Sequence, residues 1–295
     1  MAFEVPRTLS PSKVSSFTDC ALAFRFSAID HLPEPPTVAA VRGTLVHAAL
    51  ERLHLLDPAG RTPSAAAACL EEAAASLADD PEYVALGLDG EAAAALRLEA
   101  DQLVRNYFRI EDPTAVRSIG VELKVEADVD GVRLRGVIDR LELDDDGELV
   151  VTDYKTGSPP STQYERKRLV GVHIYSLLCE EVLGRRPRTV QLLYLSQPLA
   201  ITTSPTDRST RGTRRTLGAV WRAVERACER EDFRPQPSRL CDWCAFRAFC
   251  PSFGGDPGEA SRHAPERPVP PVADPVVGPS AGSAAAALVG VATDG

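Results

Sequence analysis

The stretch from Arg117 to Gly157 constrains the fold most, because apolar and polar side chains alternate along three successive runs. This two-residue period is typical of half-buried strands, and the runs are RSIGVELKVEADV, VRLRGVIDRLEL and ELVVTDYKTG. The acidic turn DDDG joins the last two runs and predicts a hairpin. We therefore expect an antiparallel sheet near the middle of the chain.

The third strand ends in two charged residues, Asp153 and Lys155, directly before a Gly and Pro rich stop. Alternation along a strand places these two side chains on the same face of the sheet. One interpretation is a surface ion pair, which contributes at most about 1 kcal/mol. The other is a carboxylate that binds a metal beside a lysine that handles phosphate charge.

A second carboxylate comes from the preceding strand. With the turn centred near Asp145 and Asp146, Asp139 falls nearly opposite Asp153, with Cβ atoms about 4.5–5.5 Å apart. Buried carboxylates this close usually share a cation or a proton, and such oxygen ligands suit Mg²⁺ or Mn²⁺. Gly136 leaves room for a close backbone approach. A register slip of one residue would instead turn one aspartate outward.

Helical patterns surround these strands. They predict helices over 9–26, 41–56 and 164–184, two or three more within 64–112, a strand over 189–198 and a long helix over 212–233. His47 lies in the second helix. Taken alone, a histidine on a helix is more often a packing or surface residue than a ligand.

Composition limits the class of protein. The chain has 295 residues, with 44% hydrophobic and 25% charged residues, which is ordinary for a soluble globular protein. No apolar run reaches the roughly 18 residues of a membrane helix, and the N-terminus does not resemble a signal peptide. We expect a cytoplasmic protein that does not enter membranes. The Pro, Gly and Ala rich segment 255–295 is expected to be disordered.

The net charge of −9 is unevenly distributed. Between Arg185 and Arg239 there are twelve arginines and five acidic residues. A basic stripe on an acidic protein can bind a polyanion locally, and Arg211, Arg214 and Arg215 are candidates for contact with DNA. A solvated helix face is an equally good interpretation of the charge pattern alone.

Seven cysteines without a secretion signal favour free thiols or a metal site over disulfides. Cys241, Cys244 and Cys250 have the spacing C-x2-C-x5-C, and Cys20 is the natural fourth ligand. Four thiolates suit either a [4Fe–4S] cluster or Zn²⁺. The remaining three, Cys69, Cys179 and Cys228, lie within helical patterns and are expected to pack in the core.

Three motifs in this order, GTLVH, GVIDRL and DYKTG, resemble those of the RecB family exonucleases in the PD-(D/E)XK nuclease superfamily. The similarity spans residues 9 to about 253. It implies an α/β, restriction-endonuclease-like core, in which a mixed sheet is flanked by helices. On this basis residues 1–254 form the nuclease domain, with a helical insertion at about 64–112 and the cysteine cluster at 241–250.

The resemblance also implies site residues. Asp139 and Asp153 correspond to metal ligands and Lys155 to the catalytic lysine. His47 corresponds to a further ligand from a helix, and the backbone carbonyl of Tyr154 is expected to complete the coordination.

Three positions in the same region match less closely. Glu122 and Tyr175 are possible accessory residues. Gly171 stands where the family usually has a Gln, four residues before the tyrosine.

The cysteine pattern has its own resemblance. The AddB helicase-nuclease and the CRISPR adaptation nuclease of this superfamily carry one early cysteine and three late ones. This similarity favours a [4Fe–4S] cluster that staples the two ends of the domain, with structural Zn²⁺ as the alternative.

The implied function is Mg²⁺- or Mn²⁺-dependent hydrolysis of DNA by an exonuclease acting on ends or single strands in repair or recombination. The alternative is a catalytically weak module that binds DNA ends within a helicase-nuclease or repair complex, and a zinc-stapled RNA nuclease is a third interpretation. The sequence contains no G-x-x-x-x-G-K-[ST] motif, so a helicase partner would be a separate chain.

Overall fold

The computed structural model describes residues 3–160, 162–260 and 262–263. Its centre is a five-stranded sheet with the order β1-β2-β3-β4-β5. The strands are β1 (Arg117–Val129), β2 (Val132–Leu143), β3 (Leu149–Lys155), β4 (Thr189–Tyr194) and β5 (Leu199–Thr203). The sheet is mixed, because β3 and β4 are parallel while the other neighbouring pairs are antiparallel. The expected α/β architecture is confirmed.

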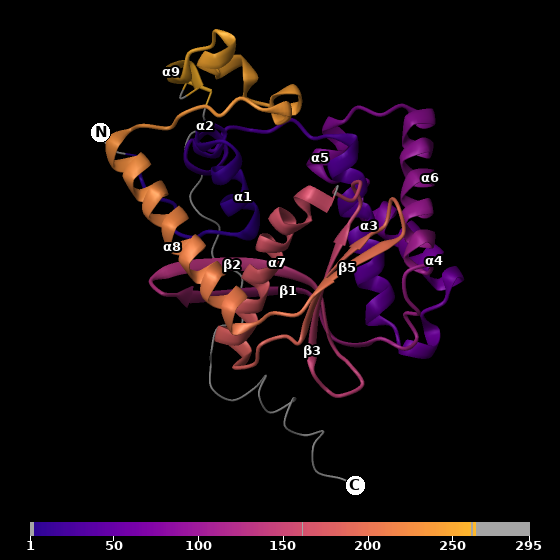
Figure 1. Cartoon of the computed structure of the whole chain (residues 1–295). Coiled ribbons are helices and arrows are strands. Elements are labelled where there is room, and N and C mark those ends of the chain that lie inside the picture. The colour runs from indigo at the N-terminus through magenta and orange to yellow at the C-terminus, as the bar shows by residue number, and fades with distance from the viewer. Residues whose placement is uncertain (1–2, 161, 261, 264–295) are drawn as a thin grey trace.

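Helices lie on both sides of the sheet (Figure 1). The longer ones are α1 (Pro11–Asp19), α3 (Val38–Leu55), α4 (Pro63–Leu77), α6 (Gly90–Tyr107), α7 (Thr162–Leu183) and α8 (Asp207–Arg230). The shorter ones are α2 (Ala21–Phe24), the π-helix η1 (Arg25–Ile29), η2 (Pro58–Gly60), α5 (Pro81–Ala85), η3 (Arg239–Trp243), η4 (Arg247–Phe249), η5 (Pro251–Phe253) and α9 (Pro257–Ala260). No described helix is both long enough and apolar enough to cross a bilayer.

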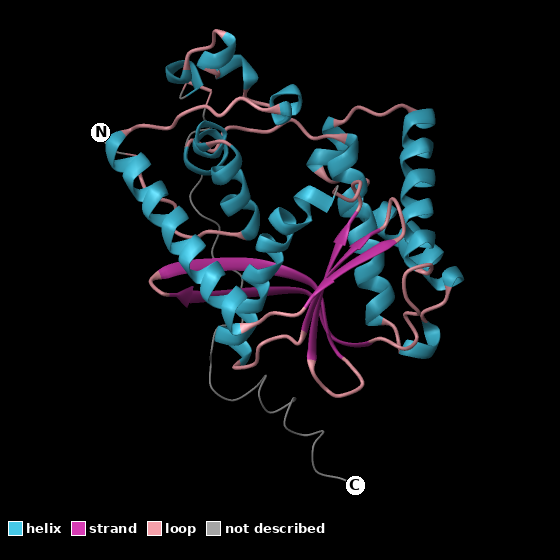
Figure 2. Ribbon diagram, in the orientation of Figure 1, coloured by secondary structure: helices cyan, strands magenta, loops and turns pink. Residues whose placement is uncertain are grey.

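Turn chemistry sets the register of the first hairpin. Asp130 and Gly131 have φ values of 54° and 80°, as a two-residue type I′ turn requires. From this turn the pairing runs back through Leu123↔Ile138 to Val121↔Arg140. The long β1–β2 hairpin extends away from the remaining strands, as Figure 2 shows.

The two faces of the sheet have separate apolar cores. One contains α1, α7 and α8 side chains packed on residues such as Leu141 and Val151. The other contains α3, α4 and α6 side chains packed on Tyr154 and Leu193. Successive residues of β3 therefore point into different cores, as the two-residue period requires. The parallel β3–β4 pair is connected by α7, because parallel strands need a crossover.

Three predicted elements differ from the structure. The strand expected over 189–198 ends at Tyr194, and a turn at 195–198 leads into β5, which the pattern did not reveal. The long α8 begins earlier than expected, because the Thr206 side chain caps it. Most of the tail that is expected to be disordered lies outside the described residues.

The N-terminal segment also differs from the single helix expected over 9–26. It is broken at Cys20, whose φ of −163° and ψ of 109° are extended. The chain therefore leaves α1, passes through one extended residue and then begins α2.

Gly136 on β2 has a packing role that can be tested. A Cβ atom there would lie 2.9 Å from Tyr175 Cε1 and 3.1 Å from Leu178 Cδ1 of α7. Gly136→Ala should therefore lower the free energy of unfolding by about 1–3 kcal/mol, measured by urea titration.

The matched control is Gly171→Ala on α7, where the nearest atom to an added Cβ is Pro11 Cβ at 4.0 Å. This variant should be neutral or stabilising by about 0.5–1 kcal/mol, because alanine favours the helix. Equal stability of wild type and Gly136→Ala would contradict the close packing of α7 on β2.

Candidate active site

The β2–β3 hairpin brings Asp139 and Asp153 together. Its pairs run from Leu143↔Leu149 to Arg140↔Thr152, and the two aspartates are the next residue on each strand beyond this last pair. Both side chains are buried, with 9% and 7% of their surfaces exposed. They project from the sheet face that carries α7, where the Tyr175 side chain lies. The register therefore matches the one expected from the turn, and neither carboxylate points outward.

Asp139 accepts a hydrogen bond from the backbone N–H of Tyr154, with an N···Oδ2 distance of 2.6 Å. Burial, followed by the negative charge of Asp153, raises the pKa of Asp139 to about 7. Two carboxylates thus occupy a dry site that provides too little positive charge for both. This is the electrostatic condition that a bound cation relieves.

His47 and Glu122 complete a compact group around Asp139. His47 Nδ1 lies 3.6 Å from Asp139 Oδ2 and 3.8 Å from Glu122 Oε1. Burial opposes protonation of His47, but a hydrogen bond that it donates to Glu122 and the charges of the carboxylates raise its pKa. One ligand atom from each of these three residues lies within 4.8 Å of the other two, and no other trio in the described ranges meets this criterion.

Glu122 has an unusual backbone conformation. It lies within β1 with a φ of 44°, which typically costs a non-glycine residue about 1–3 kcal/mol. The register places it opposite Asp139, between the pairs Val121↔Arg140 and Leu123↔Ile138. The strained residue therefore presents its carboxylate to the site, where such strain is commonly found.

Lys155 is paired with the second aspartate. Its ammonium nitrogen lies 2.5 Å from Asp153 Oδ2, and its side chain remains 41% exposed. Burial opposes the charge, but Asp153 raises the pKa of Lys155, so the lysine stays protonated at neutral pH. The ion pair expected from the sequence exists, but its carboxylate is buried.

Two tyrosines have different positions. The hydroxyl of Tyr175 lies near the carboxylates, since burial and the charges of Asp153, Asp139 and Glu122 raise its pKa. The Tyr154 side chain points to the opposite face and hydrogen-bonds Arg140. Tyr154 meets the site through its backbone N–H, which donates to Asp139, and through its ring, which packs edge to face on His47 with centroids 5.9 Å apart. At Gly171 the nearest neighbour of an added Cβ would be Pro11 Cβ at 4.0 Å.

The chemistry of this group fits Mg²⁺ or Mn²⁺. Carboxylate oxygens from Asp139 and Glu122 and one imidazole nitrogen converge, with Asp153 adjacent. Hard oxygen donors with one histidine suit these cations. The chain thus supplies donors of the right type beside two buried carboxylates.

The four predicted cluster cysteines also lie close together. Cys20, Cys241, Cys244 and Cys250 line one cavity of about 260 Å³. The break between α1 and α2 presents Cys20, and Figure 1 shows these helices next to the C-terminal segment. Backbone N–H groups of Gln236 and Ser238 donate to the sulfurs of Cys20 and Cys241 at 3.4 and 3.3 Å. All seven cysteines are free, and the other three are buried elsewhere.

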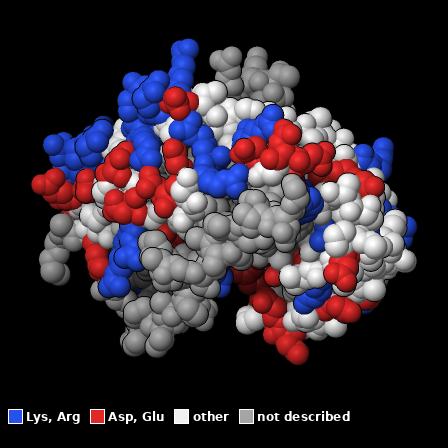
Figure 3. Space-filling view, turned by 90° about the horizontal axis from the view of Figure 1, so that it is seen from below, with Lys and Arg blue, Asp and Glu red and all other residues white. Residues whose placement is uncertain are grey.

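The basic stripe lies on α8. Its exposed arginines are spaced so that they share one helix face, and they are Arg208, Arg211, Arg215, Arg222, Arg226 and Arg230. Arg214 is different, because its guanidinium pairs with Asp130 at 3.1 Å and Glu181 at 2.5 Å. Seen from below in Figure 3, basic side chains gather toward one side, with acidic ones between them.

Sequence patterns do not predict the buried guanidinium of Arg140, and they predict Glu122 only as a possible accessory residue. Counting back from the Asp130–Gly131 turn would have placed Glu122 opposite Asp139. No comparable sequence signal marks Arg140, because its partners come from distant segments.

The raised pKa values predict how pH affects the metal-free protein. Asp139 and His47 both have pKa values above those of the unfolded chain, so their stabilising contribution is lost as pH rises through about 7. Between about pH 5 and about pH 8, unfolding in urea and EDTA should become easier by about 1–3 kcal/mol. The Asp139→Asn variant should lose most of this dependence. An identical pH dependence in the two proteins would contradict the proposed electrostatics.

Comparison with known proteins agrees with this geometry. The PD-(D/E)XK nuclease superfamily model matches residues 8–251. Gene 69 protein of Mycobacterium phage D29 is 24% identical over 267 residues, which cover 83% of this chain and 96% of the phage protein. Its counterpart in Mycobacterium phage L5 is 30% identical over 136 residues, covering 45% of this chain and 44% of that protein.

One solved structure shows the same fold. It is a Eubacterium rectale protein provisionally named an exonuclease, with a TM-score of 0.55 and 13% identity. The similarity covers 81% of this chain and 87% of the other. Because the family model spans most of the chain, the protein belongs to the PD-(D/E)XK nuclease superfamily.

Proposed function

We propose that this chain is a divalent-metal-dependent deoxyribonuclease that acts as an exonuclease on DNA ends or single strands in repair or recombination. The observation that carries the proposal is the buried pair Asp139 and Asp153, with His47 and Glu122 on one side and Lys155 on the other. A nuclease of this kind needs acidic side chains that hold a divalent cation, because the cation must offset the negative charge of the phosphate substrate.

Asp139, Glu122 and His47 would hold the metal, with Asp153 and the Tyr154 carbonyl as further ligands. When bound, the divalent ion would offset phosphate charge and supply a more acidic water. The N–H of Tyr154 holds Asp139 in one orientation. Burial by α7 keeps bulk water from the carboxylates, which strengthens their interaction with a cation.

Lys155 would act as a charged group. Because Asp153 keeps it protonated, it is suited to orient the attacking water and to stabilise negative charge on the phosphate. Its partial exposure leaves the ammonium accessible to a substrate. Removing a proton from water is a poorer role for a lysine whose pKa is raised.

The arginine face of α8 supports contact with a nucleic-acid backbone. Arg211 and Arg215 are exposed on that face and suited to phosphates. Arg214 of the predicted trio instead braces α8 through Asp130 and Glu181. DNA contact is therefore assigned to the exposed arginines.

A second candidate function is a weak nuclease that chiefly binds DNA ends for a partner helicase or repair complex. Gly171 favours it, because the glutamine usual at this place is missing and the space around an added Cβ is open. The complete set of acidic, histidine and lysine groups opposes it.

We further propose that the four cysteines hold a [4Fe–4S] cluster that joins α1–α2 to η3–η5. A zinc ion bound at about 2.3 Å would draw its thiolates close together. Among the described side chains, no three of these thiols belong to a trio whose ligand atoms all lie within 4.8 Å. Their wider arrangement around a 260 Å³ cavity supports the bulkier cluster.

The nuclease proposal predicts the effect of two substitutions. Asp153→Ala and Lys155→Ala should each slow Mg²⁺-dependent release of nucleotides from end-labelled single-stranded DNA by at least about 100-fold. Because the two groups act as a unit, the double variant should be little slower. An exonuclease should leave closed circular single strands intact, and RNA should compete poorly with DNA.

Matched controls are Asp101→Ala and Arg105→Ala, which break a surface ion pair on α6. Both should cut at the wild-type rate. Full cleavage by Asp153→Ala would contradict the assigned site, whereas DNA binding without cleavage by the wild type would support the weak binding module.

The cluster proposal predicts a visible cofactor. Anaerobically purified protein should be brown, with about four irons per chain. Cys244→Ala should lose colour and thermal stability together, because cluster binding is coupled to folding. Cys179→Ala, buried away from the cavity, should keep its colour. A colourless protein with one zinc per chain would contradict the iron assignment but would still support a metal that joins α1–α2 to η3–η5.

A further inference from the structure

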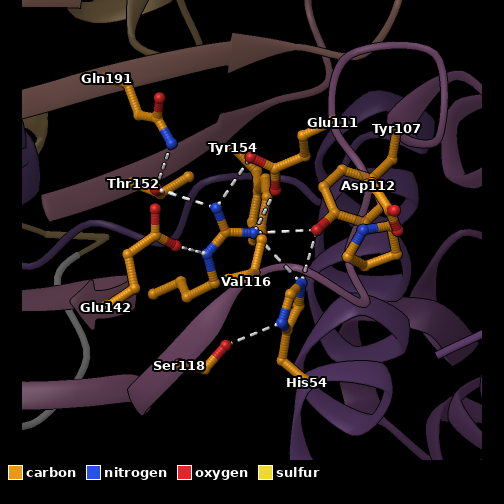
Figure 4. Close-up of polar contacts among 12 residues, drawn as sticks. His54, Tyr107, Glu111, Asp112, Val116, Ser118, Glu142, Thr152, Tyr154 and Gln191 are labelled. Atoms are coloured by element: carbon orange, nitrogen blue, oxygen red, sulfur yellow. Dashed lines mark hydrogen bonds and ion pairs between the residues drawn. The ribbon is translucent and has the colours of Figure 1, made fainter. Parts of the chain in front are cut away.

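A buried guanidinium lies directly behind the candidate metal site. Arg140 follows Asp139 on β2, so its side chain points to the opposite face of the sheet. It is 0% exposed and donates to the hydroxyls of Tyr107 and Tyr154, which belong to the core of α3, α4 and α6 and are labelled in Figure 4. Burying a positive charge is costly unless it is paired and hydrogen-bonded.

Several partners supply charge and hydrogen bonds to Arg140, although its Nε and Glu142 Oε2 are paired by charge without hydrogen-bond geometry. Glu142 lies 2.5 Å from its Nε, and Glu111 forms a two-point contact with its terminal nitrogens, of which Nη2–Oε2 measures 3.1 Å. The hydroxyls of Tyr107 and Tyr154 each lie 2.9 Å from Nη1, whose two hydrogens are shared among these hydroxyls, Glu111 and His54. Figure 4 shows these side chains converging from separate elements.

One partner is Tyr154, which ties Arg140 to β3. Its hydroxyl is bound to Arg140 on one face, while its backbone N–H donates to Asp139 Oδ2 at 2.6 Å. Tyr154 also stands between Asp153 and Lys155 in the chain. Arg140 also donates to Thr152 Oγ1 at 3.2 Å, so it holds this strand at two points.

A second partner, His54, ties Arg140 to α3. His54 Nε2 lies 3.1 Å from Nη1 and 2.6 Å from the Tyr107 hydroxyl, and since arginine only donates, Nε2 is the accepting nitrogen of the ring. His54 Nδ1–H then donates to Ser118 Oγ of β1 at 2.9 Å. His54 lies seven residues after His47, two helical turns along the same face of α3. Fixing one residue therefore fixes the placement of the other.

We propose that Arg140 is a positioning residue for the metal site. From behind the sheet, one guanidinium fixes β2, β3 and α3, which carry Asp139, Asp153 with Lys155, and His47. The inference rests on the proposed function. Groups that orient metal ligands from outside the coordination sphere typically change metal affinity about 10–100-fold when removed. Loosening the network should therefore weaken metal binding beyond any effect on stability.

The test uses Tyr154→Phe, which removes the hydroxyl but keeps the ring and the backbone of residue 154. Binding of Mn²⁺ to the metal-free full chain is measured by electron paramagnetic resonance of the free ion. Affinity should fall at least about 10-fold. Arg140→Lys, which keeps the charge but loses the planar fork, should weaken Mn²⁺ binding likewise.

The control is Val104→Ala, a cavity variant in the same core that leaves the Arg140 partners in place. It should lower the melting temperature while binding Mn²⁺ as tightly as wild type. Wild-type Mn²⁺ affinity in Tyr154→Phe, or equally weakened affinity in Val104→Ala, would overturn the positioning role. If the wild-type chain bound no Mn²⁺, the proposed metal site itself would be wrong, and the inference with it.

Discussion

The repulsion between two buried aspartates is the constraint on which the rest of the site depends. Asp139 and Asp153 directly follow the last pair of the β2–β3 hairpin, Arg140↔Thr152, and the charge of Asp153 acts on Asp139. Burial and this neighbour raise the pKa of Asp139 to about 7, so the metal-free site is electrostatically unfavourable. A fold selected only for stability would place apolar side chains there. The arrangement is reasonable if a cation supplies the missing charge, and His47 and Glu122 lie where such a cation would need them.

On the opposite face of the sheet, a buried positive charge is surrounded by acidic and hydroxyl groups. There the fully buried Arg140 is compensated by Glu111 and Glu142 and bound by two tyrosine hydroxyls. His54 stays neutral, because burial and then the charges of Arg140 and Arg61 lower its pKa to about 2. A buried cation paired with two carboxylates thus lies behind the sheet, and a group of acidic side chains lies in front of it. Because side chains alternate along a strand, successive residues of β2 and β3 face either the Arg140 network or the candidate metal site.

Much of the fold and of the candidate site could be predicted from sequence, because the sequence signals for them are local. The alternating pattern and the turns set the β1–β2–β3 register, so the sequence alone predicts Asp139 nearly opposite Asp153. Signals of longer range were missed. The Arg140 network joins α3, the end of α6, β1 and β3, and nothing in the sequence around Arg140 reveals those partners. The strained backbone of Glu122 and the break at Cys20 are likewise set by tertiary packing, which overrides local propensity. The family resemblance supplied His47, which its own helix would not have singled out.

The central claim is that a divalent cation binds between these acidic groups. Crystals soaked in Mn²⁺ and measured at the manganese absorption edge would test it directly. The account predicts an anomalous peak about 2.0–2.3 Å from ligand atoms of His47, Glu122 and Asp139. Strong Mn²⁺-dependent cleavage in solution, with the peak elsewhere and none at these three side chains, would contradict it.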